Sequence, residues 1–173
     1  MRILWVVIVA LLLSACGNVQ VKDYAGYSPA FDAEEFFNGK LLAHGVVKNR
    51  KGLVIRYFSA EIDASWEAGV GTLDERFLFD DGEEQTRVWT LKPDGENRYQ
   101  ATAGDVVGPG TAETAGNSLF LDYVLRIAYK DSTIDLRIDD RMYRVSDTVV
   151  INESVMTKFG FRVGSILLVI EKQ

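Results

Sequence analysis

Apolar and polar residues alternate along most of this 173-residue chain, with turn residues at short intervals. Between residues 119 and 129 one face is apolar, whereas the other carries Asp122 and Arg126 among Phe120 and Val124. Residues 134–139 alternate in the same way, and residues 166–170 are apolar on both faces. A period of two is typical of half-buried β-strands, and an unbroken apolar run of a covered strand. The pattern therefore predicts a sheet of consecutive hairpins with little helix.

Glycine-containing turns separate the predicted strands. Glycine readily adopts the positive φ angles of tight hairpin turns, and Asp-Gly is a strong hairpin signal. The turns are Lys51-Gly52, Asp81-Gly82, Asp94-Gly95 and Gly116-Asn117, and the strands around them include residues 40–47, 53–62, 76–79, 85–91 and 98–103. This spacing predicts about eight to ten antiparallel strands in up-and-down order.

The predicted fold class is all-β, with an antiparallel closed barrel over residues 32–173. Closure is favoured because it leaves no strand edge free to pair with another chain. A two-sheet sandwich is the alternative architecture. The positions expected in the core are Leu73, Phe77, Trp89, Leu121, Tyr123, Leu125, Leu136 and Leu168.

The amino terminus has a different character. Arg2 is followed by eleven apolar residues, 3–13, and then by two small residues and Cys16. A membrane-spanning helix needs about twenty residues, so we predict a removable secretory signal over residues 1–15. Small residues directly before a cysteine resemble the bacterial lipobox, and Cys16 is the only cysteine of the chain. We therefore expect the mature protein to carry a lipid on Cys16.

Two alternatives to lipidation are cleavage at a nearby small-residue site and a buried cysteine that lies there by chance. A single cysteine excludes an internal disulfide and a multi-cysteine zinc site.

Residues 16–31 are polar with scattered tyrosines, which predicts a lipidated tether; packing on the domain as an extended arm is the alternative. Gly17 stands where aspartate commonly retains lipoproteins in the inner membrane of Gram-negative bacteria. Because glycine and not aspartate follows Cys16, we predict that the protein is attached to the periplasmic face of the outer membrane.

The chain is acidic, with a net charge of −6 that becomes −7 without Arg2. An acidic chain without a polybasic run is a poor partner for nucleic acid. We expect membrane attachment through acyl chains, which contribute about 0.8 kcal/mol per buried methylene, and not through a basic patch.

Three groups of segments carry a family resemblance. They are Phe36-Phe37-Asn38-Gly39-Lys40 with Gly45-Val46-Val47, Gly71-Thr72-Leu73-Asp74-Glu75 with Arg87-Val88-Trp89, and Met156-Thr157-Lys158-Phe159-Gly160-Phe161-Arg162-Val163-Gly164. Together they resemble an uncharacterised family of bacterial lipocalin-like lipoproteins, a domain of unknown function, over about residues 31–172. The resemblance implies a lipocalin-like, calycin-type barrel and assigns no activity or catalytic residue. Its members are often encoded near genes that modify membrane fatty acids, which favours a lipid ligand. His44 stands where relatives have tryptophan.

No catalytic site is predicted. His44, the only histidine, is expected on the core side of a strand or at the barrel end, and no nucleophile motif accompanies it. The adjacent acidic pairs, such as Asp74 with Glu75 and Asp139 with Asp140, point to opposite faces of a strand, so neither pair forms an acid/base or metal site by itself. The acidic segment 80–84 lacks calcium-loop spacing and predicts a solvated hairpin tip. We therefore expect neither a metal nor a cofactor.

Two arginines are the candidates for ligand contact. Arg87 lies two residues before Trp89, so the two side chains share strand parity, that is, they point to the same face of the strand. The same holds for Arg56 and Phe58. A guanidinium facing an apolar cavity would bind the carboxylate or phosphate of a lipid. The alternative for each arginine is a structural ion pair, for instance with Glu75.

The segment 154–164 interrupts the strand pattern. It is expected to form a turn or short helix that closes one barrel end, with Phe159 and Phe161 as plugs and Arg162 held by an acidic group or carbonyls. The alternative is that Phe161 and Val163 begin the last strand.

These observations predict a membrane-anchored periplasmic lipoprotein that binds or carries a fatty acid, another lipid or a small apolar molecule. An envelope structural or interaction protein with a filled barrel is the alternative, and an enzyme is the third possibility. A barrel of about eight strands is either filled by side chains or holds one small ligand.

Overall fold

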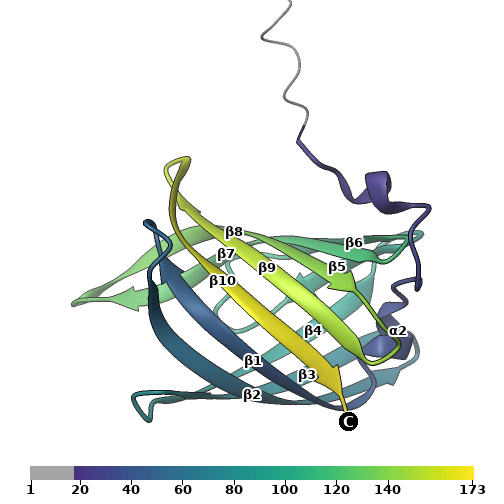
Figure 1. Ribbon diagram of the computed structural model, residues 1–173, viewed down its shortest axis with the longest axis horizontal. Coiled ribbons are helices and arrows are strands. Elements are labelled where there is room, and N and C mark those ends of the chain that lie inside the picture. Colours follow the sequence, from purple (N-terminus) through teal and green to yellow (C-terminus); the bar gives the residue numbers. More distant parts are fainter. Residues whose placement is uncertain (1–17) are drawn as a thin grey trace, which may run out of the picture.

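The computed structural model describes residues 18–173, which form one closed antiparallel barrel with a short helix at one end (Figure 1). The predicted signal segment 1–15 and Cys16 lie outside the described residues. No helix within residues 18–173 is long and apolar enough to cross a membrane.

Ten strands follow two short helical segments. The helical segments are η1 (Val21–Tyr24) and α2 (Ala33–Phe36). The strands are β1 (Gly39–Asn49), β2 (Val54–Glu67), β3 (Val70–Phe79), β4 (Glu84–Pro93), β5 (Arg98–Thr102), β6 (Gly110–Ala115), β7 (Ser118–Tyr129), β8 (Ser132–Arg144), β9 (Val149–Lys158) and β10 (Phe161–Lys172).

Each strand pairs with the next in the sequence, and β1 pairs with β10 to close the barrel. All ten pairings are antiparallel, from Leu41 opposite Lys172 in the closing pair to Leu125 opposite Leu136 between β7 and β8. The predicted all-β class, up-and-down order and closed barrel are confirmed, and the sandwich alternative is wrong. Closure follows from chemistry, because every strand then has two neighbours for its backbone groups.

The predicted turns lie between the strands as expected. Gly52, Gly82, Gly95 and Gly116 all have positive φ, at 85°, 82°, 109° and 53°. Residues other than glycine rarely adopt such angles, so these four positions fix where the chain reverses.

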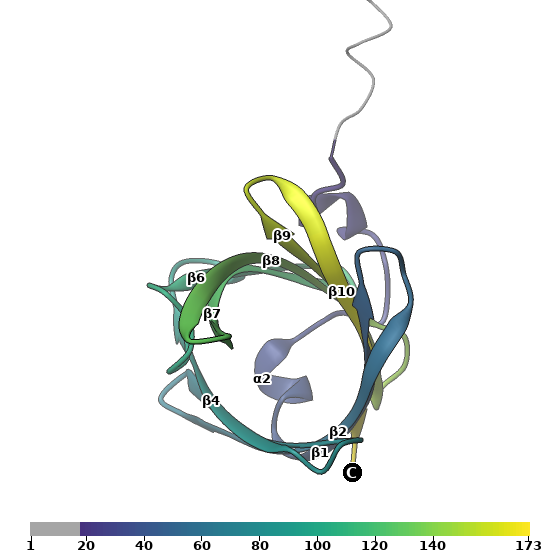
Figure 2. The same ribbon diagram turned by 90° about the vertical axis from the view of Figure 1, so that its left-hand side faces the viewer.

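The helix α2 lies across one end of the barrel (Figure 2). The Asp32 side chain accepts a hydrogen bond from the Glu35 backbone N–H at 3.0 Å and so caps the helix. Phe36 is completely buried, and its ring stands edge-on to Phe37 at 5.2 Å between centroids. The Trp66 indole N–H donates to the Phe37 carbonyl at 2.6 Å. These contacts fix α2 to β2 and close this end of the barrel with aromatic rings.

The segment before α2 contacts the outside of the barrel. The Tyr24 ring packs against Phe120 and Tyr143, with centroids 5.7 and 5.4 Å away. Arg144, almost fully buried, donates to the Ala30 carbonyl at 2.8 Å and to the Glu35 carboxylate at 2.9 Å. Part of the segment that was predicted as a tether therefore packs as an arm against β7 and β8.

The predicted core positions lie in two contacting groups of apolar side chains. Leu73, Trp89, Leu121, Leu125 and Leu136 are buried. Phe77, Tyr123 and Leu168 are partly buried against them. Period-two parity placed these side chains on the inner face because successive side chains of a strand point to opposite sides.

Two local predictions are wrong. Residues 154–164 form a plain hairpin, with β9 ending at Lys158 and β10 beginning at Phe161, so the stated alternative holds. Phe159 and Phe161 are 88% and 77% exposed and plug nothing. His44 is exposed on the outer face of β1 and does not face the core.

Candidate functional site

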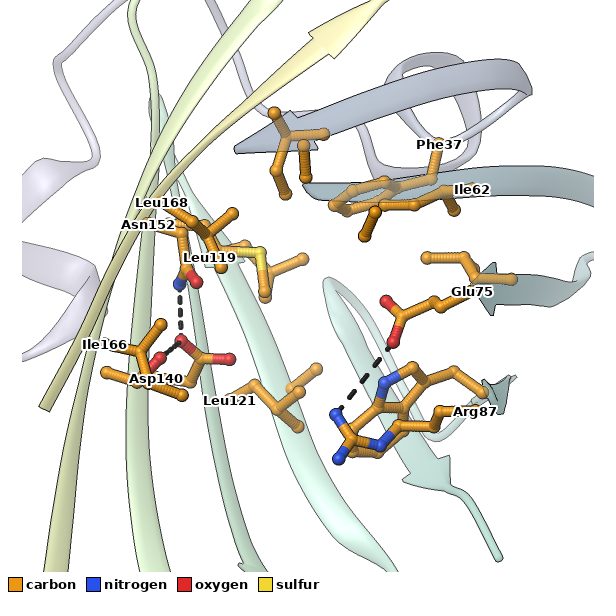
Figure 3. Close-up of a pocket in the computed structure, with 18 of the residues that line it drawn as sticks. Phe37, Ile62, Glu75, Arg87, Leu119, Leu121, Asp140, Asn152, Ile166 and Leu168 are labelled. Carbon is orange, nitrogen blue, oxygen red and sulfur yellow. Dashed lines mark hydrogen bonds and ion pairs between the residues drawn. The ribbon is translucent and has the colours of Figure 1, made fainter. Parts of the chain in front are cut away.

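The barrel encloses a cavity of about 120 Å³. Its walls are mainly apolar and come from most of the strands, with Phe37 from the α2 end (Figure 3). Such a volume exceeds the space that one water molecule needs, which is about 10–15 Å³, so the barrel is not filled completely by its own side chains.

Two carboxylic acids and one arginine line this cavity, namely Glu75 of β3, Asp140 of β8 and Arg87 of β4. Glu75 and Arg87 lie on one side, and Asp140 with Asn152 lies on the opposite side (Figure 3). We call these four residues the polar cluster. Burying charged groups is costly unless each is paired, so the hydrogen bonds of each member matter.

Arg87 is held by a carboxylate from a loop. Its Nε and Nη2 donate to Asp105, with the shortest contact at 2.7 Å. Its Nη1 lies 4.0 Å from Glu75 Oε2. The forked contact to Asp105 already satisfies the guanidinium geometry that a ligand carboxylate would use. Arg87 is therefore a paired cation and not a free one.

Glu75 is the least satisfied member of the polar cluster. Its Oε2 is buried and accepts no hydrogen bond from the described residues. Burial raises the pKa of Glu75 from its usual 4.5 to about 7, with a further increase from Asp140 and Asp105, while Arg87 and a side-chain hydrogen bond with Trp89 oppose the shift. Near neutral pH this carboxyl group carries a proton in an appreciable fraction of molecules.

Asp140 has partners of its own. Asn152 Nδ2 and Ser154 Oγ both donate to Asp140 Oδ1, the latter at 2.8 Å. Burial raises the pKa of Asp140 to about 6, against the lowering effect of these two hydrogen bonds. The two buried carboxyls, one on each side, make the cavity wall rich in hydrogen-bond acceptors.

Aromatic rings flank the polar cluster. The Trp89 and Tyr123 rings meet edge to face at 5.1 Å between centroids, and both line the cavity. The Arg87 guanidinium lies 5.8 Å from the Trp89 ring centroid and 5.7 Å from that of Phe77. Cation–π contact adds to the ion pairs that hold Arg87 in place.

Three of the four predicted ligand-contact residues line the cavity: Phe58, Arg87 and Trp89. Arg56 does not. It pairs with Asp81 and Glu83 of the β3–β4 turn, each at 2.8 Å, and stacks 3.7 Å above the Phe79 ring. This is the structural ion pair that was the alternative for Arg56.

Sequence reasoning missed Asp140, Asn152 and Ser154. Asp140 shares strand parity with the buried Leu136 and Ile138, and that parity was the available signal for an inward carboxylate. It was overlooked because Asp139 and Asp140 were considered only as a pair. The pair does point to opposite faces, since Asp139 binds Arg141 on the outside at 2.9 Å.

The cavity can accept hydrogen bonds and exchange protons near neutral pH. Ser154 has no imidazole base beside it, because His44 lies on the outer face. Within residues 18–173 no group of three or more histidine, cysteine, aspartate or glutamate side chains is placed to hold a metal ion.

Comparison with known proteins places this barrel among lipocalin-like folds. The S-type phycobiliprotein lyase CPES from Guillardia theta has a similar structure, with a TM-score of 0.61 and 13% sequence identity. The similarity covers 90% of this chain and 98% of the lyase chain. No curated protein matches the sequence. The model of a family described as "protein of unknown function (DUF3833)" matches residues 10–172, and the chain belongs to that family.

Proposed function

We propose that this protein is a lipid-anchored envelope protein whose barrel binds one small apolar molecule of the lipid class. The observation that carries the proposal is the apolar cavity of about 120 Å³ in which a buried oxygen of Glu75 lacks a donor. Apolar pockets with a few convergent polar groups are typical ligand sites. The lipocalin-like fold is compatible with this function but does not identify a ligand.

The polar cluster favours a neutral head group that donates a hydrogen bond. A free carboxylate would meet Glu75 and Asp140, and its natural partner, Arg87, is already bound by Asp105. A hydroxyl or amide N–H would satisfy Glu75 Oε2 without adding a negative charge. A long-chain alcohol, an acylglycerol or a protonated fatty acid therefore fits better than an ionised fatty acid.

Trp89 provides the test, because its ring lines the cavity. Titration of the Trp66→Phe variant, in the chain without residues 1–15 and therefore without Trp5, with 1-octanol should give a saturable change in tryptophan fluorescence. Octanoate at pH 8 should bind at least tenfold more weakly, because an unsatisfied or repelled head group costs about 1–3 kcal/mol. A titration without saturation, or tighter binding of octanoate, contradicts the proposal.

Ala101→Leu is a useful negative control for packing. Ala101 is fully buried but is not part of the cavity wall, whereas Ala112, buried to a similar degree, lines it. Ala112→Leu should weaken octanol binding by occupying the cavity. Ala101→Leu should leave the affinity of the folded fraction unchanged. Equal binding by both variants would favour the alternative function, an envelope interaction protein that holds no ligand.

Membrane attachment through Cys16 is the second part of the proposal. It is supported by the apolar run 3–13, the small residues before Cys16 and the single cysteine of the chain. Wild-type protein should incorporate radioactive palmitate and partition into detergent, whereas Cys16→Ser should not be labelled. Gly17 favours the outer membrane, and sedimentation with inner-membrane vesicles would contradict that location.

A further inference from the structure

Two hairpins at the barrel end opposite α2 carry exposed apolar side chains. Phe159 and Phe161 flank the β9–β10 turn and are 88% and 77% exposed. Leu53 and Ile55, at the β1–β2 turn, are 65% and 55% exposed. Aromatic and aliphatic groups at such positions stabilise no core, and exposed apolar patches commonly mark contact sites.

The two hairpins adjoin each other. Because β1 pairs with β10, Asn49 lies opposite Gly164 and Lys48 opposite Ser165, immediately beside both turns. Both hairpins extend beyond the body of the barrel (Figures 1 and 2). We call their tips, residues 48–55 and 158–163, the hairpin face.

The charge of the hairpin face is opposite to that of the whole chain. The net charge is −6, yet residues 36–60 and 154–170 contain no aspartate or glutamate. The basic residues of the hairpin face are Lys48, Arg50, Lys51, Lys158 and Arg162. Among residues 18–173 none of these five forms an ion pair, although Lys158 donates to the Asp135 carbonyl and Arg162 to Ser165 Oγ. Three of these cations lie within residues 48–51, and the pairing of β1 with β10 brings Lys158 and Arg162 beside them.

We propose that the hairpin face docks on an anionic phospholipid bilayer. Phe159 and Phe161 would enter the interfacial region, and the surrounding basic side chains would contact lipid phosphates. Exposed aromatic side chains prefer this interface, and each basic residue near an anionic surface contributes about a fivefold increase in affinity. Docking would turn toward the membrane the side of the barrel from which the β9–β10 hairpin projects.

The position of the amino-terminal arm agrees with such docking. In both views the first described segment, drawn in purple, and the β9–β10 hairpin project from the same side of the barrel (Figures 1 and 2). One membrane plane can therefore meet both. The docking proposal rests on the hairpin face alone and does not require a lipid on Cys16.

A dye at the hairpin tip tests the proposal directly in the full chain. Cys16→Ser with Phe159→Cys leaves one thiol for an environment-sensitive NBD label at the tip. Vesicles that contain phosphatidylglycerol should shift the emission to the blue, and added salt should reverse the shift. Glu96→Cys, exposed at the β4–β5 turn at the other barrel end, is the matched control and should show no shift.

Charge reversal separates the basic contribution from the apolar one. Lys51→Glu should raise at least fivefold the lipid concentration needed for half of the tip response, whereas Lys92→Glu, exposed on β4 away from the hairpin face, should not. An unchanged emission at position 159 in anionic vesicles overturns the proposal. An equal shift in pure phosphatidylcholine vesicles overturns the anionic preference, and a shift that grows with protein concentration without vesicles identifies a contact between copies of the chain instead.

Discussion

Glu75 is an ionisable side chain that lines the cavity of the barrel, with one buried carboxylate oxygen that accepts no hydrogen bond from the described residues. Its pKa of about 7 lies above the usual 4.5, so the folded chain holds a proton that the unfolded chain releases between these values. The free energy of unfolding should therefore fall as the pH rises from about 4.5 through 7. The full shift corresponds to a loss on the order of 3 kcal/mol.

Glu75→Gln should remove the contribution of Glu75 to this pH dependence, because glutamine keeps the shape and carries no charge. Asp140, whose pKa is raised to about 6, should keep its own contribution at lower pH. At pH 8 the variant should be more stable than wild type by up to about 3 kcal/mol. Denaturant unfolding at a series of pH values measures both quantities. Asp122→Asn, on the outer face of β7 beside Arg137, is the control and should keep the wild-type profile. A Glu75→Gln profile that parallels wild type would show that Glu75 is not the buried acid described above.

Parity along a strand explains which of these residues were predictable. Arg87, Trp89 and Phe58 share the parity of apolar neighbours, and they do line the cavity. Arg56 shares it as well, but β2 continues past the cavity, and Arg56 meets Asp81 and Glu83 at the barrel end. Parity gives the face of a strand and not the height along the barrel, which depends on register with distant strands.

At the scale of elements, Arg144 joins the arm, α2 and β8. Its side chain is almost fully buried and bonds the Ala30, Ser146 and Asp147 carbonyls as well as Glu35. Arg144→Met should lower the free energy of unfolding by about 1–3 kcal/mol, because buried acceptors lose their donor. Arg137→Met, which removes an exposed pair with Asp122, should cost less than about 0.5 kcal/mol.

Hydrogen exchange locates the effect of the Arg144 change. Loss of its contacts should increase exchange in residues 30–37, while the central strands β2 and β3 stay protected. Uniform exchange across the barrel would show that Arg144 stabilises the fold globally and does not secure the arm. The sequence did not predict that Arg144 secures the arm. Most of its acceptors are backbone carbonyls, and one of them, that of Ala30, lies more than a hundred positions away in the sequence.

Hairpins were the most predictable elements, since most are set by local alternation and a glycine with positive φ, although the β7–β8 turn has Lys130 at φ 53° instead. The β9–β10 hairpin was the exception. Its two exposed phenylalanines were interpreted as buried plugs because large aromatic residues usually lie inside. We assign the exposure of these two side chains to membrane docking. Composition alone does not distinguish a buried phenylalanine from an exposed one.

At the scale of the whole molecule, the barrel has one end covered by α2 and one end bordered by the hairpin face (Figure 2). The two proposals are compatible, since docking would bring the barrel close to the bilayer that supplies the ligand. Barrel closure and strand order could be predicted from the sequence. The cavity could not, because it depends on how completely the inward side chains of ten strands fill the interior.

The most direct test of the central claim is native mass spectrometry of the mature protein released from its own membranes in mild detergent. The account predicts one bound neutral lipid per chain, lost on mild collisional activation and reduced in the Ala112→Leu variant, which narrows the cavity. Protein of apo mass only, together with no saturable response of Trp89 to 1-octanol, would contradict the claim that the barrel binds a ligand.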